Sequence, residues 1–274
     1  MKYPAPGAGY REWAINPEFR AGVGGDGPGA SAGGDNRGEK GFMVQIMGHR
    51  GAPFYEPENT LRSFRRALKM GVAAVELDVH LTRDGRLAVI HDATLERTTN
   101  GRVRVRDFPL AELKKLDAGQ GEEIPALKEA LDLMRGQALL LVELKEPEAA
   151  GALVAFFREH RALGDAQAIS FWHPAIKAMK AEEPRLRTGA LLVGCPADPV
   201  GLARAAGADA LVLQYAYVTP ELVAAAHGHE LQVYLWNIDH AETVKPYLAM
   251  NPDLIGSNRP DVLIEYLRSL EGGT

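Results

Sequence analysis

The chain has almost no cysteine and no long apolar run. Its single cysteine, Cys195, cannot form an intramolecular disulfide, so nothing in the fold requires an oxidising compartment. No stretch approaches the roughly 18 uninterrupted apolar residues of a membrane-spanning helix. The N-terminus lacks the charged start and compact apolar run of a secretory signal. We therefore expect no stable membrane anchor and a cytoplasmic location.

An excess of positive charge is also missing. The chain carries 31 Lys and Arg against 36 Asp and Glu, which gives a formal net charge of -5. Proteins that bind the phosphate backbone of nucleic acids usually present a basic face, so we expect no nucleic-acid partner. A small anionic substrate needs only a few local cations and remains compatible with this charge.

Large apolar residues are scarce near the N-terminus. Residues 22–41 are rich in Gly, Asp and Ser, and such a segment buries too little surface to offset the entropy of ordering it. We predict a flexible Gly-rich tail over residues 1–42, with packing of this tail on the domain as the alternative. Residues 43–270 are expected to form one domain, since 46% of the chain is hydrophobic and can supply a core.

From residue 43 onward, short apolar runs alternate with amphipathic stretches. This alternation indicates parallel strands that are covered by helices. Eight such strands fit a closed (β/α)8 TIM barrel better than an open sheet. The predicted strands are residues 44–48, 73–79, 138–144, 166–171, 187–193, 209–214, 231–236 and 253–257. The predicted helices include residues 60–70, 127–134, 148–163, 174–183, 199–206, 220–228 and 241–250.

A further apolar run, residues 86–91, breaks the alternation. It follows the second strand after only a few residues, whereas parallel strands need a crossover of about a dozen residues or more. Asp84-Gly85 is a hairpin turn signal. We therefore predict a β-hairpin appended to the second barrel strand, which returns His91 to the side of Glu76 and Asp78.

Three carboxylates lie on strands that are otherwise apolar. Glu76 and Asp78 share one face of the second strand because side chains alternate along a strand, and Glu143 lies at the end of the third. Acids crowded inside a barrel repel each other and are costly to desolvate, and a hard divalent cation resolves both problems. We predict that the three acids bind one divalent cation, Mg2+ or Ca2+. The alternative is a structural network with Arg50 and Lys145.

Two histidines each end a predicted strand. His49 closes the first strand and His91 closes the hairpin strand, so both project from the end of the sheet. Active sites of such barrels are built at the carboxyl ends of the strands. Imidazole pKa values lie near neutrality, which suits general acid–base catalysis. Either histidine alone would be interpreted as a core residue, but beside three acids we predict a catalytic pair.

Further residues are expected to bind or support an anionic substrate. Arg50 offers a planar fork that matches two phosphate oxygens, and Lys145 offers a point charge. Glu58 is expected to brace Arg50 or to lie near the metal. Asn59 or Thr60 is expected to cap the helix that follows. Trp236, at the end of the seventh strand, is the predicted pocket residue.

A series of motifs follows the same order along the chain. They are His49-Arg50-Gly51, Pro57-Glu58-Asn59-Thr60, Glu76-Leu77-Asp78-Val79, Thr82-Arg83-Asp84-Gly85 and His91-Asp92, followed by Glu143-Leu144-Lys145, Ser170-Phe171 and Trp236. In these motifs and their spacing, residues 44–262 resemble the glycerophosphodiester phosphodiesterase family.

The resemblance implies a barrel, one Mg2+ or Ca2+ ion, and a defined set of roles. His49 and His91 would be the acid–base pair, the three acids would be the metal ligands, and Arg50 and Lys145 would lie near the phosphate. The implied reaction is hydrolysis of a glycerophosphodiester to an alcohol and glycerol 3-phosphate, which we expect to pass through a cyclic phosphate. The family's larger insertion after the second strand would be reduced here to residues 92–126.

Two departures from the family pattern stand near the C-terminus. The usual Trp-Thr-Val-Asn reads Trp236-Asn237-Ile238-Asp239, and the usual Thr-Asp-Arg-Pro reads Ser257-Asn258-Arg259-Pro260. We expect neither departure to touch the proposed metal or acid–base residues. Both would then alter the rim of the pocket and with it the substrate preference, leaving the reaction type unchanged.

The rival interpretations also assume a phosphodiester ligand, but they differ in its chemical class and in what the protein does to it. A lysophospholipase D would act on a lipid and would need an exposed apolar rim, for which Phe54-Tyr55 is the candidate. A lyase would stop at the cyclic phosphate. A non-catalytic phosphodiester-binding protein would bind without turnover and would leave the histidine pair without a role.

Overall fold

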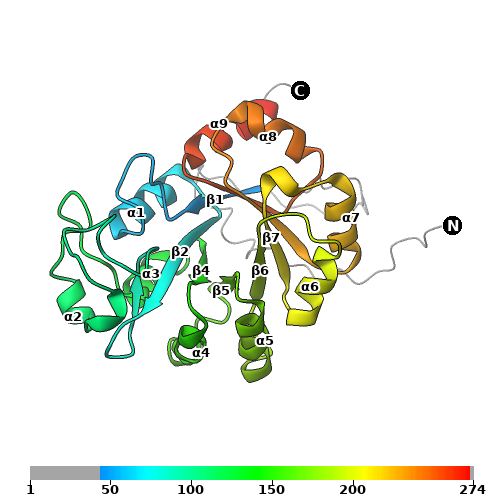
Figure 1. The fold of residues 1–274 in the computed structure, drawn as a ribbon. Helices are drawn as coiled ribbons and strands as arrows, with labels where there is room; N and C mark the ends of the chain where they lie inside the picture. The colour runs from blue at the N-terminus through cyan, green and yellow to red at the C-terminus, as the bar shows by residue number, and fades with distance from the viewer. Residues whose placement is uncertain (1–43, 272–274) are drawn as a thin grey trace, which may run out of the picture. The chain divides into compact units, whose positions relative to one another are not determined.

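Eight parallel strands close into a barrel in the part of the chain that the computed structural model describes, residues 44–271 (Figure 1). The strand order is β1–β9–β8–β7–β6–β5–β4–β2, and pairing of β1 with β2 closes the ring. The predicted (β/α)8 barrel is confirmed, whereas the predicted tail, residues 1–42, lies outside the described residues. The barrel strands are β1 (Gln45–His49), β2 (Ala74–Leu81), β4 (Leu139–Leu144), β5 (Ala166–Ser170), β6 (Thr188–Leu192), β7 (Ala210–Gln214), β8 (Gln232–Trp236) and β9 (Leu254–Ser257).

Helices follow the strands and cover the outside of the barrel (Figure 1). They are α1 (Leu61–Met70), α3 (Leu127–Met134), α4 (Ala150–Glu159), α5 (His173–Glu182), α6 (Pro199–Ala206), α7 (Pro220–Gly228), α8 (Ala241–Leu248) and α9 (Pro260–Glu271), with short 3-10 turns at Pro147–Ala149 and Tyr215–Tyr217. The ends of α1 show why helices form where the sequence predicts them. The Thr60 hydroxyl accepts the Ser63 N–H at its start, and Gly71 takes a left-handed φ of 89° at its end. Within residues 44–271, no helix is long and apolar enough to cross a membrane.

Alternation along β2 separates the core from the candidate site. Val75, Leu77 and Val79 face outward and belong to the apolar layer between strands and helices. Ala74 faces the barrel interior, where it packs in a second apolar cluster with side chains of β1 and β4 to β9. Because side chains alternate along a strand, Glu76 and Asp78 also face inward, closer to the carboxyl end. The apolar interior of the barrel therefore gives way to acids at its mouth.

The predicted hairpin is present. β3 (Leu87–Val89) pairs antiparallel with β2, with Val79 opposite Val89. The turn is closed by a hydrogen bond from Thr82 N to Arg86 O, and Gly85 takes a φ of 71°, which glycine adopts without strain. Beyond β3, the N–H of Ile90 donates to the carbonyl oxygen of Asp78 over 3.0 Å. This pairing brings the chain back from the end of β2 to the level of Asp78 immediately before His91.

Residues 92–126 form an insertion beside β2 with a small core of its own (Figure 1). The insertion contains a 3-10 turn, Val105–Asp107, and the short helix α2 (Leu110–Leu113). The core of this unit consists of Ala88, Ile90, Leu95, Val105, Leu113, Ala118 and Ile124. The insertion therefore packs against the hairpin strand as a separate layer and extends the site on that side of the barrel.

Candidate active site

The three predicted metal ligands come together at the carboxyl end of the barrel. Asp78 of β2 lies opposite Glu143 of β4 in the parallel register, and Glu76 precedes Asp78 by two residues on the same inner face. One oxygen of each carboxylate lies within 4.8 Å of the others. Exposed fractions are 3% for Glu76, 0% for Asp78 and 8% for Glu143. These three side chains are called the acid trio below.

Two cations neutralise part of the acid trio. Arg50 Nε lies 3.2 Å from Asp78 Oδ2, and Lys145 Nζ lies 2.7 Å from Glu143 Oε1 and 3.3 Å from Asp78 Oδ1. The contacts of the structural-network alternative are thus present, but they leave part of the acid trio unsatisfied. Among the described residues, Glu76 Oε1 is buried without a hydrogen-bond partner. A buried oxygen of this kind is costly unless it is satisfied, so the all-oxygen acid trio fits a divalent cation such as Mg2+ or Ca2+.

Crowding changes the protonation of the acids. Burial, with repulsion from Asp78 and Glu143, raises the pKa of Glu76 well above its usual range. Burial and the Asp78 charge raise the pKa of Glu143 to about 7. Burial also opposes ionisation of Asp78, but Lys145 and Arg50 together lower its pKa. Without a bound cation, the negative charge of the acid trio is therefore concentrated on Asp78.

His49 is held with its two ring nitrogens toward different partners. Nδ1 lies 2.8 Å from Asn258 Oδ1, and Nε2 lies 3.9 Å from Glu76 Oε2. Burial and the neighbouring Arg50 charge lower the pKa of His49 to about 4. The imidazole is therefore neutral at neutral pH, and one of its nitrogens can accept a proton.

His91 comes directly after the hairpin strand, beside β2. Its Nδ1 lies 2.5 Å from Asp92 Oδ1, and its carbonyl oxygen lies 3.0 Å from His80 Nε2. Burial lowers the pKa of His91, while the charges of Asp78 and Asp92 oppose this shift. Because the preceding residue, Ile90, bonds to the Asp78 backbone, the hairpin places His91 alongside the strand that carries Glu76 and Asp78, as the turn signal indicated.

A network of ion pairs joins Arg50 to the hairpin side of the site. Glu58 Oε1 accepts from Arg50 Nη1 over 2.9 Å, so Glu58 braces Arg50, which was one of the two roles expected for it. Arg97 of the insertion donates to both oxygens of Glu58, over 2.9 and 2.8 Å, and also to Asp92. Sequence reasoning missed Arg97, because nothing in its local pattern distinguishes it from a surface arginine.

The loop after β1 is shaped by a close turn. Gly51 takes a φ of 91°, and a Cβ atom there would lie 2.4 Å from Ser63 Oγ, so only glycine fits. The turn directs the Arg50 N–H to Glu76 Oε2 over 3.0 Å. Asn59 does not cap α1, since Thr60 does; instead, Asn59 Nδ2 donates to Asp78 Oδ2 over 2.7 Å. Of the two expected caps, Thr60 is the one that the structure uses, while the Asn59 side chain contacts the acid trio.

A pocket of about 290 Å³ opens beside His49 and Arg50. Phe54, Glu58, Asp239 and Asn258 line it, together with Pro53. Trp236 lies at the end of β8, half-buried, with its Nε1 donating to Val212 O over 3.3 Å and its ring 6.0 Å from that of Phe171. Trp236 therefore faces the barrel mouth but is not among the residues that line this pocket.

Comparison with known proteins identifies the family. Residues 49–262 match the glycerophosphoryl diester phosphodiesterase family. The chain belongs to this family. A family member from Caldanaerobacter subterraneus subsp. tengcongensis, a glycerophosphodiester phosphodiesterase, is 34% identical over 236 residues, which cover 81% of this chain and 97% of the relative. A glycerophosphodiester phosphodiesterase from Bacillus altitudinis is 32% identical, and the alignment covers 80% of this chain and 96% of that relative.

Solved structures of this phosphodiesterase family have the same fold. An Oleispira antarctica phosphodiesterase in complex with the product sn-glycerol-3-phosphate aligns with a TM-score of 0.77 at 28% identity. The alignment covers 83% of this chain and 98% of that structure. A glycerophosphodiester phosphodiesterase from Agrobacterium tumefaciens aligns with a TM-score of 0.73 at 29% identity, over 81% of this chain and all of that chain. This chain is therefore a phosphodiesterase built on the family's barrel.

One expectation about the departures from the family pattern was wrong. Asn258 was expected to lie away from the acid–base residues, yet its Oδ1 contacts His49 Nδ1. Asp239 lies behind it and accepts from Asn258 Nδ2 over 2.8 Å. The loops after β8 and β9 meet at the mouth of the barrel, and a sequence reading that treats each motif separately does not reveal such a meeting.

Proposed function

We propose that this phosphodiesterase hydrolyses glycerophosphodiesters to an alcohol and glycerol 3-phosphate, with a divalent cation and a pair of histidines. The observation that carries the proposal is the buried acid trio, with His49 Nε2 3.9 Å from Glu76, His91 on the hairpin beside β2, and Arg50 and Lys145 bound to the carboxylates. The names of the similar proteins support this substrate class, and the complex of the Oleispira antarctica relative supports this product.

The acid trio would hold the cation. When bound, a divalent cation would supply charge neutralisation at the phosphoryl oxygens. Arg50 would contribute a planar guanidinium to the same group, and Lys145 a point charge. Glu58 and Arg97 keep the Arg50 guanidinium in place through the ion-pair network. Residues of this chain therefore orient the phosphodiester before any proton moves.

His49 and His91 would move the protons. One imidazole removes the proton of the glycerol 2-hydroxyl, whose oxygen bonds to phosphorus and forms a cyclic phosphate. The other imidazole protonates the alcohol oxygen as its bond to phosphorus breaks. Water then opens the cyclic phosphate with the two proton transfers reversed, which releases glycerol 3-phosphate.

Product release under metal control tests this function. Glycerol 3-phosphate should form from glycerophosphocholine and glycerophosphoethanolamine, stop after chelation, and resume when Mg2+ or Ca2+ is added back. The exposed Glu159 of α4 provides a matched control. After metal is added back, Glu159→Gln should form product like the wild type, whereas Glu143→Gln should not. A rate that is unchanged by exhaustive chelation would contradict the role of the cation.

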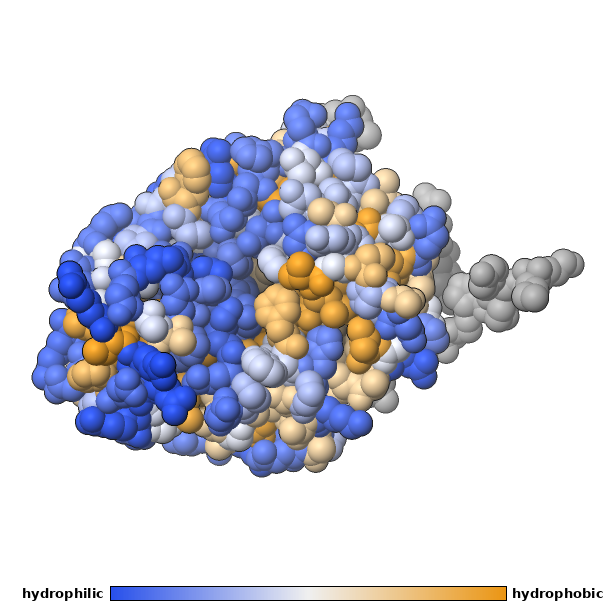
Figure 2. Space-filling model, viewed as in Figure 1, coloured by the Kyte–Doolittle hydropathy of each residue, from blue (hydrophilic) through white to orange (hydrophobic). Residues whose placement is uncertain are grey.

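A lipid substrate is the second candidate function, and exposed aromatic side chains favour it. Phe54, which lines the pocket, is 61% exposed, and Phe171 and Trp172 after β5 are 44% and 51% exposed. Trp172 Nε1 donates to the carbonyl oxygen of Lys145, next to the acid trio. Figure 2 also shows an apolar area over the region of β6 and β7. Such side chains would contact the acyl chain of a lysophospholipid.

Phosphorus NMR of the products separates the remaining interpretations. Glycerol 3-phosphate alone supports the proposed hydrolase. A persistent cyclic phosphate identifies a lyase, and a lysophosphatidic acid product identifies a lysophospholipase D. Tight binding of glycerophosphocholine with no new phosphorus signal would indicate a non-catalytic binding protein and would overturn the proposal.

A further inference from the structure

Three side chains from separate loops form a hydrogen-bonded chain at the wall of the pocket. Asp239 follows β8, Asn258 follows β9, and His49 ends β1. Asp239 Oδ2 accepts from Asn258 Nδ2 over 2.8 Å, and Asn258 Oδ1 lies 2.8 Å from His49 Nδ1. A carboxylate, an amide and an imidazole are thus connected in that order, with the imidazole at the end next to the acid trio.

Asp239 fixes which way the Asn258 amide points. Besides the Asn258 side chain, the Asp239 carboxylate accepts the Asn258 backbone N–H over 2.7 Å and the Ser257 hydroxyl over 3.0 Å. The backbone carbonyl oxygen of Asn258 accepts the Phe54 N–H over 3.4 Å, which also holds the residue in place. An ionised carboxylate only accepts hydrogen bonds, so the NH2 group of Asn258 must face Asp239. The amide oxygen is therefore left to face His49.

The orientation of Asn258 determines the tautomer of His49. An amide oxygen only accepts, so the hydrogen of the neutral imidazole must be on Nδ1. Nε2 then has a free lone pair, and this is the nitrogen that lies toward Glu76. The nitrogen that faces the acid trio is consequently the one that can take up a proton.

Asn237 does not override this arrangement. Its Nδ2 lies 3.0 Å from the same His49 Nδ1, where a donor would favour the opposite tautomer. Yet Asn237 Oδ1 is buried with no hydrogen-bond partner among residues 44–271, so nothing fixes the direction of its amide. A half-turn would exchange its nitrogen and oxygen and place a second acceptor beside Nδ1–H. The Asn258 amide, which Asp239 holds in one direction, therefore determines the tautomer of His49.

We propose that Asp239 and Asn258 are positioning residues that hold His49 as the Nδ1–H tautomer, with Nε2 free to accept a proton at the acid trio. The proposal rests on the proposed function, in which His49 transfers a proton. It also accounts for the two departures from the family pattern as one exchange. The family pattern has Asn at 239 and Asp at 258, whereas this chain has the carboxylate at 239 and the amide at 258.

Ring-nitrogen NMR of histidine-labelled enzyme at slightly alkaline pH measures the tautomer directly. The chain has eight histidines, and the His49 signal is assigned by its loss in His49→Gln. In the wild type, His49 should be the Nδ1–H tautomer. Asp239→Asn, which keeps the shape but removes the fixed acceptor, should shift His49 toward the Nε2–H tautomer. It should also lower kcat by about 10-fold or more with little change in KM, because the proton acceptor is misplaced.

The exchanged double variant, Asp239→Asn with Asn258→Asp, separates positioning from simple loss of packing. It puts a carboxylate beside Nδ1–H and should restore both the wild-type tautomer and most of kcat. Asp253→Asn is the matched control. It makes the same change beside His227, which lies 3.0 Å from Asp253 at the amino end of β9, and it should leave the His49 signal unchanged.

The positioning role of Asp239 and Asn258 and the proton transfer by His49 can be refuted separately. An unchanged His49 tautomer in Asp239→Asn, or no recovery of the tautomer in the exchanged double variant, would overturn the positioning role. A changed tautomer with unaltered kcat would support the positioning role and refute the proposed proton transfer by His49.

Discussion

The Arg97 guanidinium donates two hydrogen bonds to the Asp92 carboxylate, from Nε to Oδ2 over 2.6 Å and from Nη2 to Oδ1 over 3.0 Å. Asp92 in turn contacts the ring of His91. Because Arg97 also binds Glu58, the residue that braces Arg50, one guanidinium connects the predicted proton-transfer residue to the predicted phosphate-binding residue.

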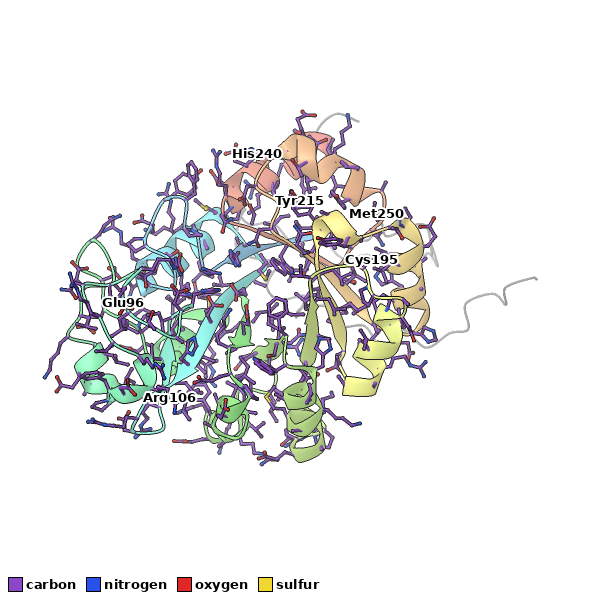
Figure 3. All side chains as sticks on the ribbon, viewed as in Figure 1. Glu96, Arg106, Cys195, Tyr215, His240 and Met250 are labelled. Carbon is purple, nitrogen blue, oxygen red and sulfur yellow. The ribbon has the colours of Figure 1, made fainter. Side chains whose placement is uncertain are left out.

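Loss of Arg97 should therefore disturb both sides of the site. We expect Arg97→Ala to fold normally and to lower kcat/KM by about 10-fold or more, since small misplacements of catalytic groups are costly. Arg106→Ala is the control, because Arg106 is an exposed arginine at the edge of the same insertion (Figure 3). Equal activity of the two variants in steady-state assays would contradict the connecting role of Arg97.

Removal of the hairpin histidine should stop proton transfer without unfolding the barrel. His91→Ala should lower kcat by about 100-fold or more, the usual scale for a lost general acid or base. His240→Ala removes an exposed histidine at the start of α8 and should leave kcat unchanged (Figure 3). Thermal melting should be similar for both variants. Near-normal turnover of His91→Ala would remove His91 from the mechanism.

Glu76→Gln should separate metal binding from stability. Burial and its acidic neighbours already raise the pKa of Glu76, so loss of its charge should change the melting temperature of the metal-free protein by only about 2 °C. The increase in melting temperature that Mg2+ or Ca2+ produces should largely disappear, because one of three ligands is lost. Differential scanning fluorimetry with and without metal checks both effects. A full metal-induced shift in Glu76→Gln would mean that the ion binds elsewhere.

Protons should compete with the cation at the acid trio. The pKa of Glu143 is raised to about 7, so this carboxylate must lose a proton to bind metal near neutral pH. The affinity for Ca2+ should therefore rise about 10-fold between about pH 6 and about pH 8 and fall as the pH drops through 7. Isothermal titration calorimetry at the two pH values measures this change. A flat profile would show that Glu143 is not a ligand.

The sequence was sufficient to predict the barrel, the hairpin and the positions of the acids. Strand alternation placed Glu76 and Asp78 on one face, and the Asp84-Gly85 turn returned the chain to them. Both inferences depend on local geometry, which a pattern of alternating residues records. The register between β2 and β4, which sets Glu143 opposite Asp78, was not predicted and is a finding of the structure.

The residues that the sequence did not reveal act across long separations. Asn258 meets His49 from 209 positions away, and Arg97 reaches Glu58 across 39 positions. Neither contact follows from periodicity, because each is set by how two loops meet after the barrel has closed. The choice between Asn59 and Thr60 as the helix cap has a similar origin, since both residue types are good caps and the contact of Asn59 with Asp78 depends on how the loop meets β2.

The hairpin has a consequence for how this enzyme fails. His91 follows a three-residue strand that pairs with β2, is bridged to Ala126 on its other side, and is backed by the small core of the insertion. The acid trio lies inside the closed ring. Modest heat or denaturant can loosen a thin appended layer before the ring itself opens. An enzyme stressed in this way would keep the acid trio in place yet lose turnover, and would regain turnover on cooling without refolding from the beginning.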